Sequence, residues 1–211
     1  DLTLAGLGEH RFGAGKGVSN MIFVGIGTGI GGGIILDNKV YTGTSGSAGE
    51  IGHIVTQPNG PKCGCGNRGC LEAIASGNSL VKLARKRVEA GENSSLNKLI
   101  SQSTKLKESP SDFSSKSIFE NALLGDLLSK SIISSGAMAL GTGLATLVNL
   151  FNPQIIVIGG GLASQWNLYI EPAIVEMSKL TLPQPREDVK IVPSSLKGLA
   201  GALGAITLLE N

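Results

Sequence analysis

The segment MIFVGIGTGIGGGIILDNKVYT, residues 21–42, decides which fold this chain is expected to adopt. Short apolar runs rich in isoleucine and valine alternate in it with turn residues. A glycine-rich turn follows the first run, and Asp37-Asn38 separates the second run from the third. Apolar runs of this length between turn residues are typical of consecutive strands. The segment therefore predicts an antiparallel meander of three strands.

The remainder of the chain predicts helices and further strands. Apolar side chains recur at helical spacing in residues 71–90 and 126–150. Residues 154–158 are a continuous apolar run before three glycines, as in a buried strand that enters a tight turn. The Ser- and Lys-rich residues 93–117 predict loops with short helices. After residue 161 the sequence predicts a helix at 164–179, a strand at 189–192 and a helix at 200–209. The order βββα then βαβα indicates an α/β domain with a mixed sheet.

Length and composition restrict the classes of partner. The chain has 211 residues, enough for a sizeable apolar core. Charged residues make up 16% of it and the formal net charge is +2, so we expect no nucleic acid to bind through this segment by counterion release. The sequence contains no cleavable signal segment, and no apolar run approaches the roughly 20 residues that span a bilayer. We therefore expect a cytoplasmic chain without a membrane partner.

The strongest chemical signal is a group of metal-ligating side chains. His53 precedes Cys63, Cys65 and Cys70, which are the only cysteines and lie in glycine-rich turn sequence. Three thiolates and one imidazole complete the tetrahedral shell of Zn²⁺, leaving a net charge of about −1 and no open coordination position. The alternative is three buried, unligated cysteines beside an unrelated histidine, which does not explain their clustering. The spacing therefore predicts a structural rather than a catalytic zinc.

Two glycine-rich turns are candidate phosphate sites. The first contains Gly27, Thr28, Gly29 and Gly31, and the second is Gly159-Gly160-Gly161. Consecutive glycines expose backbone N–H groups to phosphate oxygens, and the turn after a strand is where α/β sheets place ligands. A hairpin that only needs positive φ would have the same composition, and the first run matches neither the Walker A nor the dinucleotide-binding pattern. The residues by themselves leave both interpretations open.

Carboxylates near the cysteine-rich segment are candidate sugar ligands. Glu50 and Glu72 lie within three residues of metal-ligating side chains, so a bound metal would hold both in one region. Carboxylates are good acceptors for sugar hydroxyl groups. Isolated acids usually face solvent, and we expect this of Glu9 and Glu120.

Residues 49–77, GEIGHIVTQPNGPKCGCGNRGCLEAIASG, closely resemble the signature of the ROK (repressor, ORF, kinase) family, in particular its glucokinase-like members. The resemblance continues through VGIGTGIGGGIILDNKVYTG (24–43), which is similar to the family's second phosphate loop. It also includes FNPQIIVIGGG (151–161), similar to the adenosine-side strand and turn, and LKGLAGALGAI (196–206). Essentially the whole chain is therefore covered.

The resemblance implies an actin-like ATPase lobe, which is ribonuclease-H-like, with a mixed sheet and an inserted zinc-binding loop. Family members have two lobes with a sugar cleft between them. Residues 1–211 would then be the C-terminal lobe, with the zinc and sugar loop at 43–77, and the N-terminal lobe would lie outside the chain. In the family, the Glu and His of GExGH and the Glu of CLE bind the sugar, which carries over to Glu50, His53 and Glu72. The zinc ligands carry over to His53, Cys63, Cys65 and Cys70.

The first residues, DLTLAGLGE (1–9), resemble the family's NDANAAALGE stretch, in which the Asp is the catalytic base. This match places Asp1 at the base and Glu9 at the closing Glu. Thr3 stands where the family has a second Asn, and the Asn that precedes the base lies outside the chain. By the same resemblance, the amides around Thr28 and Gly29 would face the phosphates of ATP.

As a function, the resemblance implies ATP-dependent phosphorylation of a hexose at its 6-hydroxyl, with zinc as structural ion and Mg²⁺ accompanying ATP. Asp1 would accept the hydroxyl proton as the oxygen attacks the γ-phosphorus in line. The Glu of GEIGH favours glucose, and a homo-oligomer, dimer or tetramer, is implied too. The chief alternative is a sugar-sensing transcriptional regulator of the same family whose DNA-binding domain lies outside the chain. A third alternative is a zinc-stabilised assembly module, in which Glu50 and Glu72 would have no ligand to bind.

Overall fold

The computed structural model describes residues 2–105 and 113–207 and contains the mixed sheet that the sequence predicts. The described strands are β1 (Met21–Ile26), β2 (Ile30–Leu36), β3 (Lys39–Val40), β4 (Ile155–Gly159) and β5 (Lys190–Pro193). Their order is β3-β2-β1-β4-β5, with β1, β2 and β3 successively antiparallel and with β4 and β5 parallel to β1. The predicted meander of three strands is confirmed, and two parallel strands extend it.

The turn between β2 and β3 has the predicted residues. Asp37 and Asn38 have positive φ angles of 49° and 63°. Asn and Asp tolerate this left-handed conformation better than most residues, and two such residues in succession suit a tight hairpin between twisted strands.

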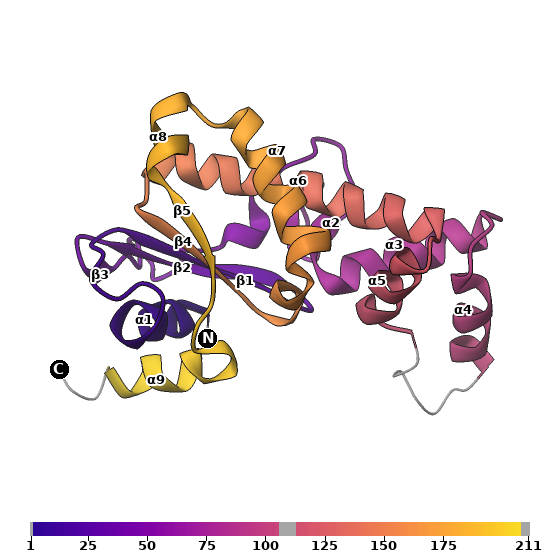
Figure 1. Cartoon of the computed structure of the whole chain (residues 1–211), viewed down its shortest axis with the longest axis horizontal. Coiled ribbons are helices and arrows are strands. Elements are labelled where there is room, and N and C mark those ends of the chain that lie inside the picture. Colours follow the sequence, from indigo (N-terminus) through magenta and orange to yellow (C-terminus); the bar gives the residue numbers. More distant parts are fainter. Residues whose placement is uncertain (1, 106–112, 208–211) are drawn as a thin grey trace.

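Helices cover both faces of the sheet (Figure 1). Helices α1 (Leu2–Phe12) and α9 (Ala200–Thr207) lie against one face, and α6 (Leu127–Phe151) and α7 (Glu171–Leu180) lie against the other. Ile22 and Val24 of β1 join the core on the α6 side, whereas Met21 and Phe23 pack in the core on the α1 side. Because successive strand residues point to opposite faces and both faces are covered, β1 and β4 are buried along their whole length.

Helix α6 spans 25 residues and forms the centre of the larger core. Asp126 caps its first turn by accepting a hydrogen bond of 2.7 Å from the Ser129 amide, and Asn152 ends it in a left-handed conformation. In contrast to the expectation from sequence, α6 is long and apolar enough to cross a membrane by length and composition. However, 67% of its most apolar window is buried inside the molecule, as in the core helix of a globular domain.

The predicted helix at 71–90 consists of two helices, α2 (Leu71–Ala75) and α3 (Gly77–Glu89). Ser76 between them is extended, with φ −75° and ψ 158°, and its hydroxyl accepts a hydrogen bond from the Ser79 amide. The buried Tyr169 hydroxyl donates a hydrogen bond of 2.6 Å to the Ala75 carbonyl at the end of α2. The break therefore depends on a cap and on a distant side chain, neither of which alters the spacing of the apolar residues.

Other elements differ from the predictions mainly at their ends. The Ser- and Lys-rich connection contains α4 (Leu96–Lys105) and α5 (Ser115–Leu123). The predicted helix at 164–179 begins with a 3-10 segment (Gly161–Gln165) and a π-helical turn (Trp166–Ile170) before α7. Three short elements were not predicted: α8 (Pro183–Asp188) and the 3-10 turns Ile51–His53 and Lys197–Leu199. Residues 208–209 of the last predicted helix lie outside the described residues.

One acidic residue that was predicted to face solvent is buried instead. Glu9 is fully buried, with 0% of its surface exposed, so the prediction that it faces solvent is wrong. It lies where α1 meets the segment after β5 and accepts hydrogen bonds from Ser194, Ser195 and Leu196. Glu120 faces solvent as predicted, since 57% of its side chain is exposed.

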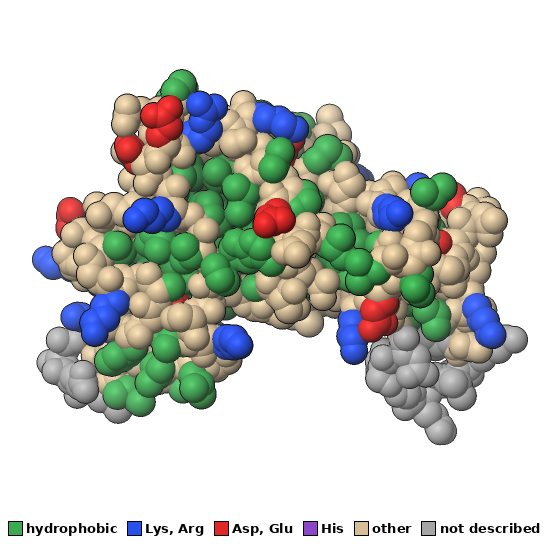
Figure 2. All heavy atoms as spheres, in the orientation of Figure 1, with side chains coloured by type: hydrophobic (Ala, Val, Ile, Leu, Met, Phe, Trp, Pro, Cys, Tyr) green, Lys and Arg blue, Asp and Glu red, His purple; other side chains and the backbone are tan. Residues whose placement is uncertain are grey.

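Figure 2 shows one face of the molecule in the orientation of Figure 1, with β5 and α7 toward the viewer. Hydrophobic side chains form a broad band across the middle of this face, and basic and acidic side chains are scattered around it. Because the two signs of charge are interspersed, this face lacks the continuous basic surface that is typical of nucleic-acid-binding domains.

Candidate functional site

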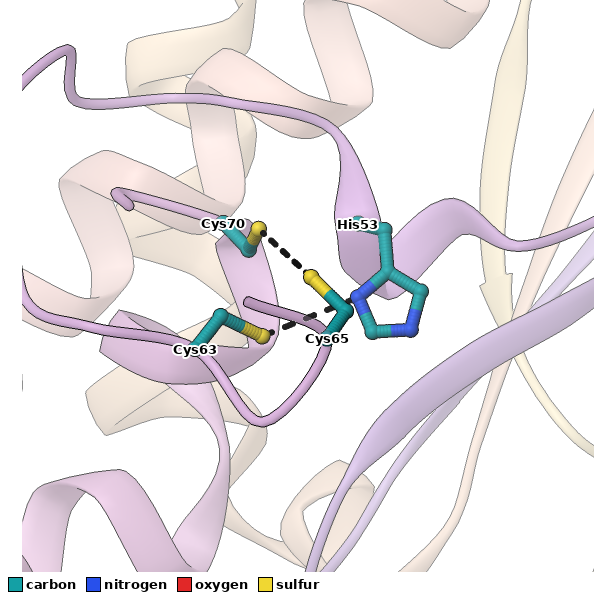
Figure 3. Close-up of side chains that lie close together, drawn as sticks. All are labelled: His53, Cys63, Cys65 and Cys70. Atoms are coloured by element: carbon teal, nitrogen blue, oxygen red, sulfur yellow. Dashed lines mark hydrogen bonds between the residues drawn. The ribbon is translucent and has the colours of Figure 1, made fainter. Parts of the chain in front are cut away.

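The side chains of His53, Cys63, Cys65 and Cys70 converge on one point (Figure 3). Their ligand atoms all lie within 4.8 Å of one another. The distance between Cys63 Sγ and His53 Nδ1 is 3.7 Å, and that between Cys65 Sγ and Cys70 Sγ is also 3.7 Å. The structure thus brings together all four residues that the sequence predicts as metal ligands.

This arrangement has nearly the dimensions of a tetrahedral metal site. With a metal–sulfur distance of about 2.3 Å, the sulfur atoms of a regular tetrahedron lie about 3.8 Å apart. The two observed contacts of 3.7 Å are close to this edge length, and they leave room for an ion between the four atoms. Three soft thiolates and one imidazole are the donor set that suits Zn²⁺. The four residues present therefore fit such an ion.

The surroundings of Cys70 favour its protonated thiol as long as no cation is bound nearby. Burial raises the pKa of the Cys70 thiol to about 12, and its contacts with Cys65 and Cys63 act in the same direction. Because Cys70 is fully buried, water cannot stabilise a thiolate at this position. A bound dication would compensate the charge of three thiolates, which is why metal binding at such sites releases protons.

Close backbone contacts shape the loop that carries these ligands. Val55 pairs with Cys70, and Lys62 pairs with Arg68, as two isolated antiparallel bridges. Gly69 lies against the Gln57 carbonyl so closely that a Cβ atom would be 1.7 Å from its oxygen. Only glycine fits such a contact, and the φ of Gly69 is also positive, at 74°.

His53 connects the metal-ligating cluster with Glu50. Its Nδ1 faces the Cys63 thiol, whereas its Nε2 lies 3.7 Å from Glu50 Oε2. The two ring nitrogens therefore face different groups, so a metal on Nδ1 would leave Nε2 as the nitrogen that carries the proton. The side chains of His53 and Glu50 are 37% and 68% exposed, so a ligand can reach both.

Glu72 lies beside the first glycine-rich turn. Its Oε2 accepts a hydrogen bond of 2.9 Å from the Ile30 amide, the first residue of β2. A Cβ atom on Gly29 would be only 2.5 Å from the same oxygen, so the carboxylate occupies the space that a side chain at this position would need. The structure thus places a predicted sugar ligand next to a predicted phosphate turn, although they are far apart in sequence.

The two glycine-rich turns lie next to each other at the end of the parallel strands. Gly25 of β1 pairs with Gly159 of β4. The following Gly160 has a φ of 84° and packs on the backbone of Ile26, and a Cβ atom on Gly27 would be 3.9 Å from the Gly161 amide nitrogen. Both turns therefore present backbone to the same region, at the carboxyl ends of β1 and β4.

Gly31 is separate from these turns. It lies within β2, where it pairs with Gly25 and packs against the Leu2 side chain of α1. The Gly159 position is also inside a strand, β4, and is buried. Of the glycines predicted to contact phosphates, those in the turns proper are Gly27, Gly29, Gly160 and Gly161, with Thr28 exposed between the first two.

Asp1, the predicted catalytic base, lies outside the described residues. The neighbouring Leu2 packs over Gly25 and Gly31, which places the start of α1 above the β1–β2 hairpin.

Two backbone amides contribute to the site although no sequence pattern predicts them. The Ile30 amide binds Glu72, and the Gly77 amide at the start of α3 donates a hydrogen bond of 2.8 Å to the Gly27 carbonyl. Backbone groups of this kind become part of a site only through the tertiary fold.

Known proteins resemble the chain over its whole length. The ROK family model matches residues 1–211. The glucokinase of Thermotoga maritima is 34% identical over 205 residues, which are 97% of this chain and 62% of that protein. The xylose repressor of Bacillus subtilis is 35% identical over 202 residues, which are 96% of this chain and 47% of that protein. The chain therefore spans less than two thirds of the length of these two relatives.

A solved structure has the same fold. The ROK family glucokinase from Streptomyces griseus, crystallised in complex with glucose and AMPPNP, is 36% identical, with a TM-score of 0.79 over 98% of this chain and 65% of that chain. The mixed sheet with helices on both faces fits the actin-like ATPase fold of this family. On the family match and on both identities, the chain belongs to the ROK family.

Proposed function

We propose that this chain is the C-terminal lobe of an ATP-dependent sugar kinase that phosphorylates a hexose, with glucose favoured, at its 6-hydroxyl. The observation that carries the proposal is the contact of Glu72 with Gly29 and Ile30, which puts a carboxylate that we propose as a sugar ligand beside a glycine-rich turn that we propose as a phosphate site. Phosphoryl transfer requires both substrates to be held next to each other in line. The similarity to glucokinases supports the same reading.

In this proposal, three side chains hold the sugar. Glu50 and Glu72 accept hydrogen bonds from ring hydroxyls, and His53 donates one through Nε2, the nitrogen that faces away from the thiols. Asp1 is the general base that removes the proton of the 6-hydroxyl. The amides around Thr28 and Gly29 face the β- and γ-phosphates, and the turn at 159–161 faces the nucleotide side. Such preorganised donors stabilise the charge that develops during transfer.

We further propose that His53, Cys63, Cys65 and Cys70 hold a structural zinc ion. The support is the near-tetrahedral spacing of their four ligand atoms. The ion would fix the loop at 43–77 and the orientation of the His53 ring, and it would have no coordination position free for catalysis. Mg²⁺ would accompany ATP and neutralise phosphate charge.

The proposal also includes the rest of the protein and its assembly. A second, N-terminal lobe with a DxGGTK-like phosphate loop would complete the cleft, in line with the length of the relatives. The whole protein would be a cytoplasmic homo-oligomer, dimer or tetramer, with no membrane partner and no nucleic acid bound through this lobe.

The Asp1→Asn change in the complete protein tests the kinase assignment. Loss of a general base should lower kcat by about 100-fold or more while the affinity for glucose stays nearly unchanged. A coupled assay for glucose 6-phosphate and calorimetric titration with glucose measure the two quantities, and the exposed Glu120→Gln variant is the control. Near-normal kcat in Asp1→Asn would remove Asp1 from the mechanism. A wild-type protein that binds glucose but forms no product would contradict the kinase function itself.

The second candidate is a sugar-responsive transcriptional regulator. The similarity to the xylose repressor favours it, since that protein is a regulator at an identity close to that of the glucokinase. The segment before Asp1 in the complete protein separates the two candidates, because a DxGGTK-like loop indicates a kinase and a basic helix-turn-helix indicates a regulator. The proximity of Glu72 to the glycine-rich turn is why we place the kinase first.

A further inference from the structure

A groove that begins at the proposed sugar and ATP contacts and extends away from them lies between α3 and the loop that carries the cysteines. It has a volume of about 830 Å³ and reaches from Thr28 and Gly29 to Ser135 of α6. This volume is in the range that holds a small organic ligand. Its walls carry four basic side chains, Lys62, Arg68, Lys82 and Lys86, and one acidic side chain, Glu72.

The basic side chains come from both walls in two pairs. Lys82 and Lys86 are four residues apart in α3, so they lie on one face of the helix, one turn from each other. Lys62 and Arg68 are paired across an antiparallel bridge of the opposite wall, so their side chains are neighbours as well. Two pairs of like charges that face one groove repel one another, and a bound anion would relieve this repulsion.

The three lysine ammonium groups have no counterion in the part of the chain that the structure describes. Within residues 2–105 and 113–207, none of Lys62, Lys82 and Lys86 takes part in an ion pair. Arg68 donates one hydrogen bond of 3.3 Å to the Gly60 carbonyl, which leaves most of its guanidinium donors for other partners.

Charge is graded along the groove. Asn78 and Ser79 lie at the start of α3, close to Glu72, whose backbone carbonyl accepts a hydrogen bond from the Ser79 hydroxyl. Lys86 is eight residues further on, about 12 Å along the helix axis. One end of the groove therefore offers hydroxyl, amide and carboxylate groups, and the other end offers cations. No aromatic side chain lines the groove among the described residues, so it provides no stacking surface for a purine base.

We propose that this groove is a binding site for a small phosphate monoester that carries several hydroxyl groups, of the hexose phosphate class. The phosphate lies among Lys82, Lys86 and the Lys62–Arg68 pair, and the hydroxyl groups lie toward Asn78 and Ser79, without using Glu72 of the proposed sugar site. Because Glu72 and Gly29 lie at one end, a bound ester is in a position to influence the proposed sugar site. The site itself does not require the chain to be a kinase.

Calorimetric titration of the chain with glucose 6-phosphate tests the site, with the double variant Lys82→Gln/Lys86→Gln. Both lysines are exposed, so the variant should fold, and removing a repulsive pair should leave its melting temperature equal or slightly higher. We expect the wild type to bind the ester. The affinity of the variant should be lower by a factor of about ten or more. The matched control Lys98→Gln/Lys130→Gln removes the same charge at exposed positions outside the groove and should bind as the wild type does.

A third variant distinguishes this groove from the proposed sugar site, where a reaction product could also bind. Glu50→Ala alters a proposed sugar ligand that does not line the groove, so it should leave binding of the ester unchanged. Inorganic phosphate should displace the ester and glucose should not. The proposal is overturned if the wild type does not bind the ester at millimolar concentration, or if glucose displaces it. It is equally overturned if Glu50→Ala abolishes binding while Lys82→Gln/Lys86→Gln retains it.

Discussion

Glu9 is a buried carboxylate that joins helix α1 to the segment after strand β5. Burial by itself would raise its pKa, but hydrogen bonds from the Ser194 hydroxyl and from the amides of Ala14, Leu196 and Ser195 outweigh this effect and lower the pKa. The carboxylate is therefore held in its charged form by the hydrogen-bond donors around it. Such a group stabilises the fold only while it is ionised.

Replacing Glu9 by Gln should lower the free energy of unfolding at pH 7 by about 3 kcal/mol, because a neutral amide binds the buried donors more weakly and brings an NH₂ group toward them. The pH dependence follows from the lowered pKa. The contribution of the wild-type carboxylate is fully present above its unfolded-state pKa of about 4.3 and is lost as the pH falls through the lower folded-state value. Urea denaturation at several pH values from neutral down to this range should therefore give a difference between wild type and variant that shrinks with acidity.

The exposed Glu120→Gln variant is the control for this experiment, and it should stay within about 0.5 kcal/mol of the wild type. Comparison at equal pH also cancels the loss of any bound metal, which both proteins share. A Glu9→Gln variant as stable as the wild type at pH 7 would contradict the structural role of the carboxylate.

At the scale of elements, the loop at 43–77 has little regular structure to hold it. Its described hydrogen bonds are mostly turns and two isolated bridges, and its exposed stretches include Glu50 and Cys65. Metal ligation at four points would supply the order that strand pairing does not. The same loop carries Glu50 and His53, so its order and the proposed sugar site depend on each other.

The Cys65→Ser change should release the metal and weaken sugar binding together. Wild-type protein should contain about one equivalent of zinc by mass spectrometry, since closed tetrahedral sites bind tightly. The variant should contain much less, and its amide hydrogens in residues 50–72 should exchange faster while those of β1 and β4 stay protected. Asn67→Ser changes an exposed, non-ligating residue of the same loop and should retain zinc and protection. Substoichiometric zinc in carefully purified wild type would refute the metal assignment.

At the scale of the whole molecule, the proposed function assigns to this chain one wall of the cleft in which phosphoryl transfer would take place. The proposed sugar ligands and both glycine-rich turns lie on this chain, and the relatives are longer than the region they share with it. Transfer needs both substrates oriented together and protected from water.

The 211-residue chain should therefore bind zinc but form no measurable glucose 6-phosphate with ATP and Mg²⁺. Weak binding of glucose through Glu50, His53 and Glu72 is expected to persist, because one loop and the helix that follows it carry all three. A coupled assay of the chain beside the complete protein measures the difference. Robust product formation by the chain would mean that the phosphate site or the lobe boundary has been misplaced.

Local patterns in the sequence were sufficient for many elements of the fold. The meander at 21–42, the helix at 126–150 and the strand at 154–158 all correspond to elements of the structure, because their apolar spacing and turn residues act over short distances. The break at Ser76 was not predictable, since it depends on the Tyr169 hydroxyl from another part of the chain. Glu9 was misjudged for a similar reason, because most of its hydrogen-bond donors follow it by more than 180 residues.

For the site, the sequence by itself determined the chemistry of the ligands. The spacing of His53 and the three cysteines was enough to predict a metal site, because short glycine-rich segments confine such ligands to one place whatever the rest of the fold does. Only the tertiary structure decided that Glu72 lies against Gly29, that the turns at 27–29 and 159–161 adjoin, and that four basic side chains face one groove. These arrangements depend on strand order and helix packing between distant segments, and local sequence patterns carry no information about which distant segments will meet.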